Sequence, residues 1–373
     1  MSEPTDDPPL VTRPNAPAPP RPRPGLLEAV VWCLIFLAVQ LCGAVVAVAV
    51  VFTAYSLAAP EPGKFVDEQL NGFSKSVEKN PEGERPPMPF AIGQALAWGM
   101  LAAQFASLAL IAVVLPRRIG KDWKRQVGVR WPHGLHVALV LLVAPGFMIV
   151  AEFVQQLFVQ LTGLEPVSMK HLLGVFDRFP WPLTLLAVAV GPGVVEELWF
   201  RGFLGRGLAA RYGLVAGVLL TSALFAVVHL SPPQLLVYVL MGAYLHFVYV
   251  ATRSIWPAVL LHTLNNGIGI TLMLVVPDKM DRPLPLVVPL AALALTLFAS
   301  AALWTSRAEL EPLTRRDEGW WESDGWKPES PGVSAPPADA NVRLVYATVS
   351  PAALMFTLAS FAALLYLVYR FAG

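Results

Sequence analysis

The stretch WPLTLLAVAVGPGVVEELWFRGF, residues 181–203, decides how the whole sequence is interpreted. Its first half is apolar enough to enter a bilayer, yet its second half carries Glu196, Glu197 and Arg201. A second apolar run, LVAGVLLTSALFAVVHL at 214–230, follows shortly after it. Two acids and a guanidinium in such surroundings indicate membrane helices that hold a polar site.

The composition of the chain is that of a membrane protein. Apolar residues make up 55% of the 373 residues and charged residues only 14%, with a mean hydropathy of +0.57. A soluble domain carries about 25% charged residues. The net charge of +1 offers no basic surface to nucleic acid. Cys33 and Cys42 stand nine apart in one apolar run, which excludes a disulfide framework or a CxxC metal site.

Apolar runs predict an all-α, polytopic transmembrane bundle. A bilayer core needs about 20 apolar residues per helix. We predict eight or nine spans, because the fifth and sixth runs are short. The runs cover 29–58, 90–115, 134–161, 181–209, 212–230, 235–251, 255–276, 284–304 and 345–369.

The distribution of Lys and Arg predicts which side each loop occupies. Basic residues dominate the loop at 116–133, whereas acids outnumber bases at 60–89. We therefore expect the amino terminus and the 116–133 loop to be cytoplasmic. Arg211 and Arg253 belong on the same side, and the SPPQ turn at 231–234 belongs outside.

Composition also divides the chain into four parts. The Pro-rich start predicts a disordered cytoplasmic tail, and the last part contains a cytoplasmic linker at 306–343. The four parts are the tail at 1–25, N-terminal transmembrane helices at 26–162, a helical core at 163–276 that contains Glu196, Glu197 and Arg201, and C-terminal helices at 277–373.

Polar residues within the core fall at helical spacings. Glu197 and Arg201 are four residues apart with the acid first, which is the better order for an intrahelical ion pair. Glu196 is rotated by about 100° from Glu197, so we expect it to face an open site as a general base. Farther on, Phe225 precedes His229 by four residues, as His262 precedes Asn266. The candidate catalytic set is Glu196, His229, His262 and Asn266, supported by Glu197 and Arg201.

The alternative is that these groups only join helices by hydrogen bonds. A charged residue at the bilayer centre costs about 2.5–3.5 kcal/mol on insertion scales. Burying three ionisable groups between Glu196 and Arg201 therefore costs more free energy than packing the helices with apolar side chains. We favour a functional site for this reason. Tyr238 and Tyr244, in contrast, are assigned to packing.

Together these patterns resemble the CPBP family, which comprises the CAAX proteases and bacteriocin-processing enzymes and is also called the Abi family. The resemblance covers about a quarter of the chain, at 180–276. Its three motifs stand in order as EELWFR (196–201), FAVVH (225–229) and HTLNN (262–266).

The resemblance implies intramembrane hydrolysis of a peptide bond, with 163–276 as the catalytic core. Glu196 and His229 would activate a water, and His262 and Asn266 would stabilise the oxyanion. The substrate would be a membrane-anchored or amphipathic peptide or protein, cleaved in a bacterial inner membrane, and nucleic acid would be no partner.

Two chemistries stay open. The HExxH pattern is absent, but Glu196, His229 and His262 could form a His₂Glu zinc site in principle. We favour metal-free chemistry based on glutamate, without a cofactor.

The predicted spans place these groups at different depths: Glu196 in the middle, His229 near the outer end and His262 nearer the inner end. Convergence then requires a broken or displaced helix, for which residues 191–193 and 231–233 supply Gly and Pro. A non-catalytic scaffold or a bacteriocin-immunity-type protein that binds a peptide is the alternative function. A proton-coupled transporter is a third, which the lack of an internal repeat disfavours.

Overall fold

The structure is a computed structural model that describes residues 24–77, 88–164, 174–176, 178–275, 284–312 and 342–372. The predicted disordered tail at 1–25 lies almost wholly outside these residues. The same is true of most of the predicted linker at 306–343.

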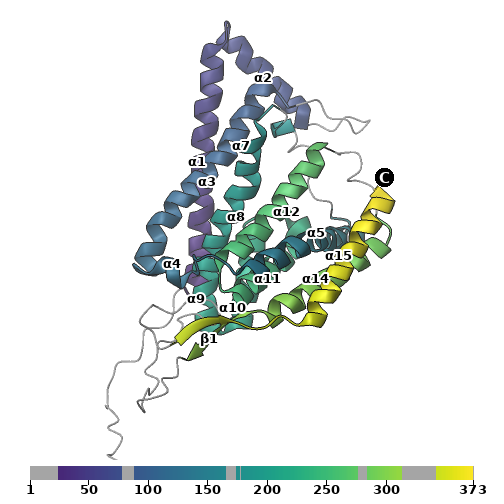
Figure 1. Ribbon diagram of the computed structural model, residues 1–373. Helices are drawn as coiled ribbons and strands as arrows, with labels where there is room; N and C mark the ends of the chain where they lie inside the picture. The colour runs from purple at the N-terminus through teal and green to yellow at the C-terminus, as the bar shows by residue number, and fades with distance from the viewer. Residues whose placement is uncertain are drawn as a thin grey trace, which may run out of the picture.

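Eight helices in the described part of the chain are long and apolar enough to cross a membrane, which confirms the predicted helical bundle (Figure 1). The fifth predicted run, at 212–230, forms only the shorter helix α10 (Leu214–Val227). The eight long helices are α1 (Leu26–Ala58), α3 (Phe90–Arg118), α5 (Gly134–Thr162), a composite helix over Trp181–Tyr212, η3 with α11 (Pro232–Gln234 and Leu235–Thr252), α12 (Ile255–Val275), α14 (Val287–Thr305) and α15 (Pro351–Ala372).

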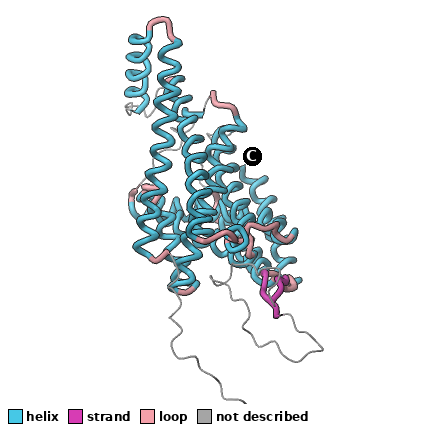
Figure 2. Tube along the Cα trace, turned by 90° about the vertical axis from the view of Figure 1, so that its left-hand side faces the viewer, coloured by secondary structure: helices cyan, strands magenta, loops and turns pink. Residues whose placement is uncertain are grey.

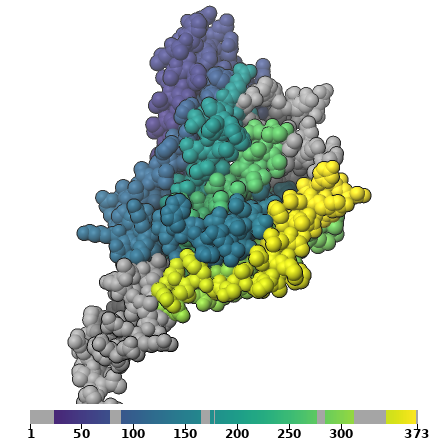
Figure 3. All heavy atoms as spheres, viewed as in Figure 1, coloured from purple at the N-terminus to yellow at the C-terminus, as the bar shows by residue number. Residues whose placement is uncertain are grey.

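Helices α1 and α3 pack along each other and, together with α2 (Pro62–Val77), project beyond the other helices at one end (Figures 1 and 3). Small residues allow this close approach. A Cβ atom on Gly99 would lie 2.7 Å from Cγ2 of Val48, and one on Gly43 would lie 2.8 Å from Cβ of Ala106. Small residues at helix interfaces are the usual means of tight packing in lipid.

The fourth long helix alternates between α-helical and π-helical winding. Its segments are α7 (Trp181–Leu185), η1 (Leu186–Val190), α8 (Gly191–Glu196), η2 (Glu197–Gly205) and α9 (Arg206–Tyr212), of which η1 and η2 are π-helical. Such π segments are rare and frequently occur at functional sites. The break predicted at 191–193 is therefore a change of winding rather than an interruption of the helix.

Aromatic residues of α1 and η2 pack against each other in the core between these two helical segments. Phe36 stacks on Trp199 with ring centroids 5.1 Å apart, and Trp32 contacts Trp199 and Phe203 edge-on. Trp199 and Phe203 are buried. The face of η2 opposite to the acids thus serves packing.

One helix and two strands of the described residues were not predicted from the sequence. Helix α2 (Pro62–Val77) lies within the predicted loop at 60–89, where Gln69 Oε1 accepts a hydrogen bond of 3.1 Å from the Ala91 amide. It is amphipathic, so a search for continuous apolar runs passes over it. The strands β1 (Ala308–Pro312) and β2 (Val342–Tyr346) pair antiparallel at the two ends of the predicted linker (Figure 2).

The basic connections meet at one end of the bundle. The Leu26 amide donates to the Tyr212 hydroxyl at 3.2 Å, and Nε of Arg130 donates to the Arg253 carbonyl at 2.6 Å. In turn, Nε of Arg253 donates to the Ala308 carbonyl at 3.0 Å. Burial, with the nearby Arg130 charge, lowers the pKa of Arg253 to about 10. These contacts confirm that the amino-terminal end of α1, Arg253 and the start of β1 lie on the same side.

Candidate active site

The predicted ion pair between Glu197 and Arg201 forms in the interior of the bundle. Nη1 of Arg201 lies 2.7 Å from Oε1 of Glu197, and the two side chains are 1% and 0% exposed. Nη2 of Arg201 donates to the Gly242 carbonyl of α11 at 2.9 Å, and the guanidinium lies 4.6 Å from the Phe225 ring centroid. Arg201 therefore joins η2 to α10 and α11.

Glu196 points elsewhere, as its position on the helix predicts. Its side chain is 15% exposed, in contrast to the fully buried Glu197. Oε2 of Glu196 is buried and makes no hydrogen bond to any described residue. The two adjacent acids thus divide into one that is paired inside the bundle and one that is directed to its accessible edge.

His229 faces Glu196 from the end of α10. Its Nδ1 lies 2.7 Å from the Phe225 carbonyl, which can only accept, so Nδ1 carries a hydrogen. The other ring nitrogen, Nε2, lies 3.9 Å from Oε2 of Glu196. The geometry fixes which edge of the imidazole meets the carboxylate.

The shortness of α10 explains how these two groups meet. Its 14 residues extend about 21 Å, whereas a bilayer core is about 30 Å thick. Glu196 lies near the middle of the helix Trp181–Tyr212, and His229 is in contact distance of it. The turn at 231–234 therefore follows directly after a residue that lies beside the middle of a neighbouring long helix. The predicted position of this turn outside the membrane stays a prediction.

His262 of α12 binds the inner acid rather than Glu196. Its Nδ1 lies 2.8 Å from Oε1 of Glu197, the same oxygen that pairs with Arg201. Nε2 of His262 makes no hydrogen bond within the described part of the chain. The sequence did not predict this link, because it joins two helices that are 65 residues apart.

Asn266 lies one turn beyond His262 and contacts η1. Its Nδ2 donates to the Val188 carbonyl at 3.1 Å, and its Oδ1 accepts from Nδ2 of Asn265 at 3.2 Å. Pro192 accounts for the first contact, since it lacks the N–H that an α-helix would direct to the carbonyl of residue 188. In the sequence, the proline four residues after Val188 was the sign that the Val188 carbonyl lacks its usual helical donor.

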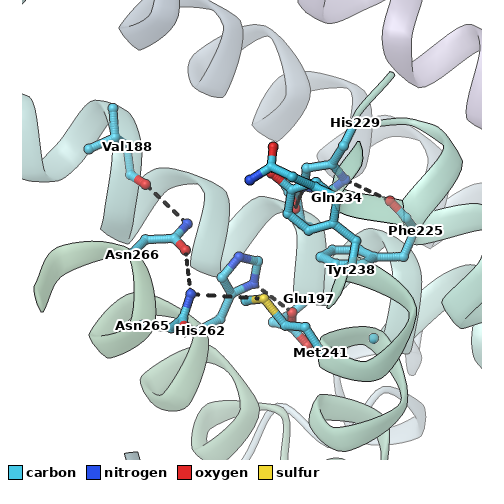
Figure 4. Close-up of polar contacts among 12 residues, drawn as sticks. Val188, Glu197, Phe225, His229, Gln234, Tyr238, Met241, His262, Asn265 and Asn266 are labelled. Carbon is cyan, nitrogen blue, oxygen red and sulfur yellow. Dashed lines mark hydrogen bonds and ion pairs between the residues drawn. The ribbon is translucent and has the colours of Figure 1, made fainter. Parts of the chain in front are cut away.

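Phe225 lies among these groups (Figure 4). Its ring centroid is 4.8 Å from that of His229 and 6.0 Å from that of His262. The structure thus brings the six predicted residues into one neighbourhood in two layers. Glu196 and His229 form the accessible layer, Glu197, Arg201 and His262 form the buried one, and Asn266 borders η1.

The donor set does not fit the zinc site that the sequence left open. No group of three or more His, Cys, Asp or Glu side chains that could hold a metal ion is found among the residues described. Nδ1 of His262 is directed to Glu197 instead of Glu196.

Comparison with known proteins agrees with the geometry. The family model described as type II CAAX prenyl endopeptidase Rce1-like matches residues 178–268, a range that includes all six candidate residues. This segment of the chain is therefore similar to the Rce1-like (CPBP/Abi) family. The chain is also similar to the Putative membrane peptidase YdiL of Bacillus subtilis (strain 168), with 27% identity over 198 residues that cover 50% of this chain and 78% of that protein. No solved structure matches the chain significantly. The protein thus combines the helices of a multi-pass membrane protein with a segment that is similar to a peptidase family.

Proposed function

We propose that the protein is an intramembrane endopeptidase in which Glu196 and His229 activate a water molecule. The observation that carries this proposal is the 3.9 Å gap between Oε2 of Glu196 and Nε2 of His229. This gap is too long for a hydrogen bond, but one water can lie within hydrogen-bond distance of both atoms. The side chains are 15% and 23% exposed, so a peptide can approach them.

In the proposed reaction Glu196 acts as general base. It takes a proton from the water while His229 orients the water, and the water oxygen bonds to the carbonyl carbon of the peptide. When the C–N bond breaks, Glu196 returns the proton to the leaving nitrogen. One water is consumed, and a carboxyl group and an amine are formed. General base catalysis of this kind contributes about 10²–10⁴ in rate.

His262 and Asn266 are the proposed donors to the oxyanion. Nδ1 of His262 donates to Glu197, so Nε2 becomes a donor when the ring is an imidazolium. The Glu197 carboxylate then lies between two cations, His262 and Arg201, and the surplus positive charge favours the oxyanion. Asn266 offers the N–H of Nδ2 that is not used by Val188. Losing one such donor typically costs about 10²–10³ in rate.

The proposed substrate is a membrane-anchored or amphipathic peptide that reaches the site from the bilayer. The proposed location is a bacterial inner membrane with the amino terminus in the cytoplasm, which agrees with the basic connections gathered at one end. The matched family is described by its action on prenylated CAAX sequences, so a prenylated CAAX peptide is the first probe. An unmodified amphipathic peptide is the second.

Glu196→Gln tests the proposal. The purified full-length protein is reconstituted in liposomes with each probe, and the products are identified by mass spectrometry. We expect the variant to lose activity by a factor of about 10² or more, because the base is absent. Glu152→Gln is the matched control, since Glu152 is an exposed acid of α5 that accepts a hydrogen bond from Gln156. Parental activity in Glu196→Gln would reject the proposal, and probe binding without cleavage by the parent would favour a peptide-binding protein.

A further inference from the structure

Tyr238 packs face to face with His229 (Figure 4). The ring centroids are 4.0 Å apart and the planes are inclined by 26°. Tyr238 belongs to the first turn of α11, whereas His229 follows the end of α10. The stack therefore closes the turn between these two helices, and this contact goes beyond the general packing role expected from the sequence.

Hydrogen bonds hold the Tyr238 hydroxyl and the turn at 231–234 in place. The hydroxyl donates to Oε1 of Gln234 at 3.3 Å, and Oγ of Ser231 donates to the same oxygen at 3.0 Å. Nε2 of the buried Gln155 in α5 donates to the Pro233 carbonyl at 3.0 Å. The turn at 231–234, which leads into the first turn of α11 with Tyr238, is thus anchored to α5.

The imidazole of His229 has few other restraints. It makes one hydrogen bond, from Nδ1 to the Phe225 carbonyl, and the Phe225 ring meets it edge-on at 60°. A single hydrogen bond leaves the ring free to rotate about the bond axis. A flat partner at 4.0 Å removes this freedom, because a rotated imidazole would collide with it.

We propose that Tyr238 is a positioning residue, which holds the imidazole of His229 so that Nε2 faces Glu196. This inference rests on the proposed peptidase function, because it assigns Tyr238 a part in the orientation of the attacking water. It does not require Tyr238 to touch the substrate.

Tyr238→Leu tests the inference, with Tyr244→Leu as matched control. Tyr244 is on the same helix, stacks on Phe147 with ring centroids 4.6 Å apart and shares a hydrogen bond with Ser300. Among the described residues it has no ring contact or hydrogen bond with a candidate site residue. For the prenylated CAAX and amphipathic peptides, we expect Tyr238→Leu to lower kcat about ten- to hundredfold with KM unchanged, since small misplacements of a catalytic group have effects of this size. Tyr238→Phe keeps the ring and should restore most of kcat. If Tyr238→Leu does not fold, Tyr238→Met replaces it.

A second readout does not depend on peptidase activity. The rate at which diethyl pyrocarbonate modifies His229 is measured by mass spectrometry in the full-length protein. We expect Tyr238→Leu to raise this rate and Tyr244→Leu to leave it unchanged, because only the first variant uncovers the imidazole. The inference would be overturned if Tyr238→Leu had the kcat and the modification rate of the parent. It would also be overturned if Tyr244→Leu showed the same fall in kcat and the same rise in modification rate as Tyr238→Leu. If the parent cleaves neither peptide, the proposed function fails and the modification rates alone decide the inference.

Discussion

Glu197 organises the buried layer of the site at the scale of single residues. One oxygen, Oε1, receives both Nη1 of Arg201 at 2.7 Å and Nδ1 of His262 at 2.8 Å. Burial of a charge in this environment is tolerated only when the charge is paired. Glu197 therefore neutralises Arg201 and orients His262, and Glu196 remains as the acid that we propose for the chemistry.

Removing Arg201 should destabilise the fold strongly. Arg201→Ala leaves Glu197 buried with only His262 as partner, and we expect a loss of about 3–5 kcal/mol in unfolding free energy. Arg343→Ala is the control. It breaks an exposed ion pair with Glu311 and should cost about 1 kcal/mol or less. Unfolding in detergent micelles measures both losses.

The double variant Glu197→Gln/Arg201→Met sharpens this test, because it leaves no buried unpaired charge. It should be more stable than Arg201→Ala. If Arg201→Ala is as stable as the parent, or the double variant is less stable than Arg201→Ala, the assigned role of the ion pair is wrong.

At the scale of elements, the π-helical winding around α8 positions two parts of the site. η1 presents the Val188 carbonyl to Asn266, and η2 begins at Glu197, where the two acids diverge. Pro192 accounts for the first of these features, because it cannot supply the N–H that a regular α-helix would direct to the Val188 carbonyl.

Pro192→Ala tests this role of the proline. The new N–H can bond to the Val188 carbonyl, which competes with Asn266 for the same acceptor. We expect peptidase activity to fall about tenfold through loss of orientation, while thermal stability is maintained or increased. The matched control is Pro145→Ala, which removes a proline from the interior of α5. Parental activity in Pro192→Ala would contradict the assignment.

The sequence predicted local geometry better than contacts between helices. The Glu197–Arg201 pair and the divergent Glu196 follow from a helical period, and the structure has both. The His262–Glu197 bond, the Asn266–Val188 bond and the Tyr238–His229 stack each join separate elements, and no spacing within one helix predicts them. The depth conflict around His229 came from extending α10 across the membrane, whereas the helix ends at Val227.

At the scale of the whole molecule, the described part of the chain has eight long apolar helices and the shorter apolar helix α10, which ends beside the acids. The Rce1-like segment at 178–268 makes up the polar centre, and α1, α3, α14 and α15 flank it in sequence on both sides. The short helix α10 lets a histidine meet the middle of a neighbouring long helix.

Sidedness of the molecule can be measured with single cysteines. In a chain with Cys33 and Cys42 replaced by Ala, Lys75→Cys is placed on α2 and Lys121→Cys on the basic loop, at opposite ends of α3. We expect a membrane-impermeant maleimide to label Lys75→Cys in intact spheroplasts and Lys121→Cys only after permeabilisation. The reverse pattern would place the basic end outside and contradict the proposed orientation.

Hydrolysis in ¹⁸O-labelled water tests the central claim most directly. The reconstituted parent, Glu196→Gln and Glu152→Gln are incubated with the prenylated CAAX and amphipathic peptides. Mass spectrometry then measures the mass of the product that carries the new carboxyl group. If Glu196 activates the water, we expect the parent and Glu152→Gln to place one ¹⁸O atom in that carboxyl group. We expect Glu196→Gln to form almost no product. Equal ¹⁸O-labelled product from Glu196→Gln and the parent would contradict this claim.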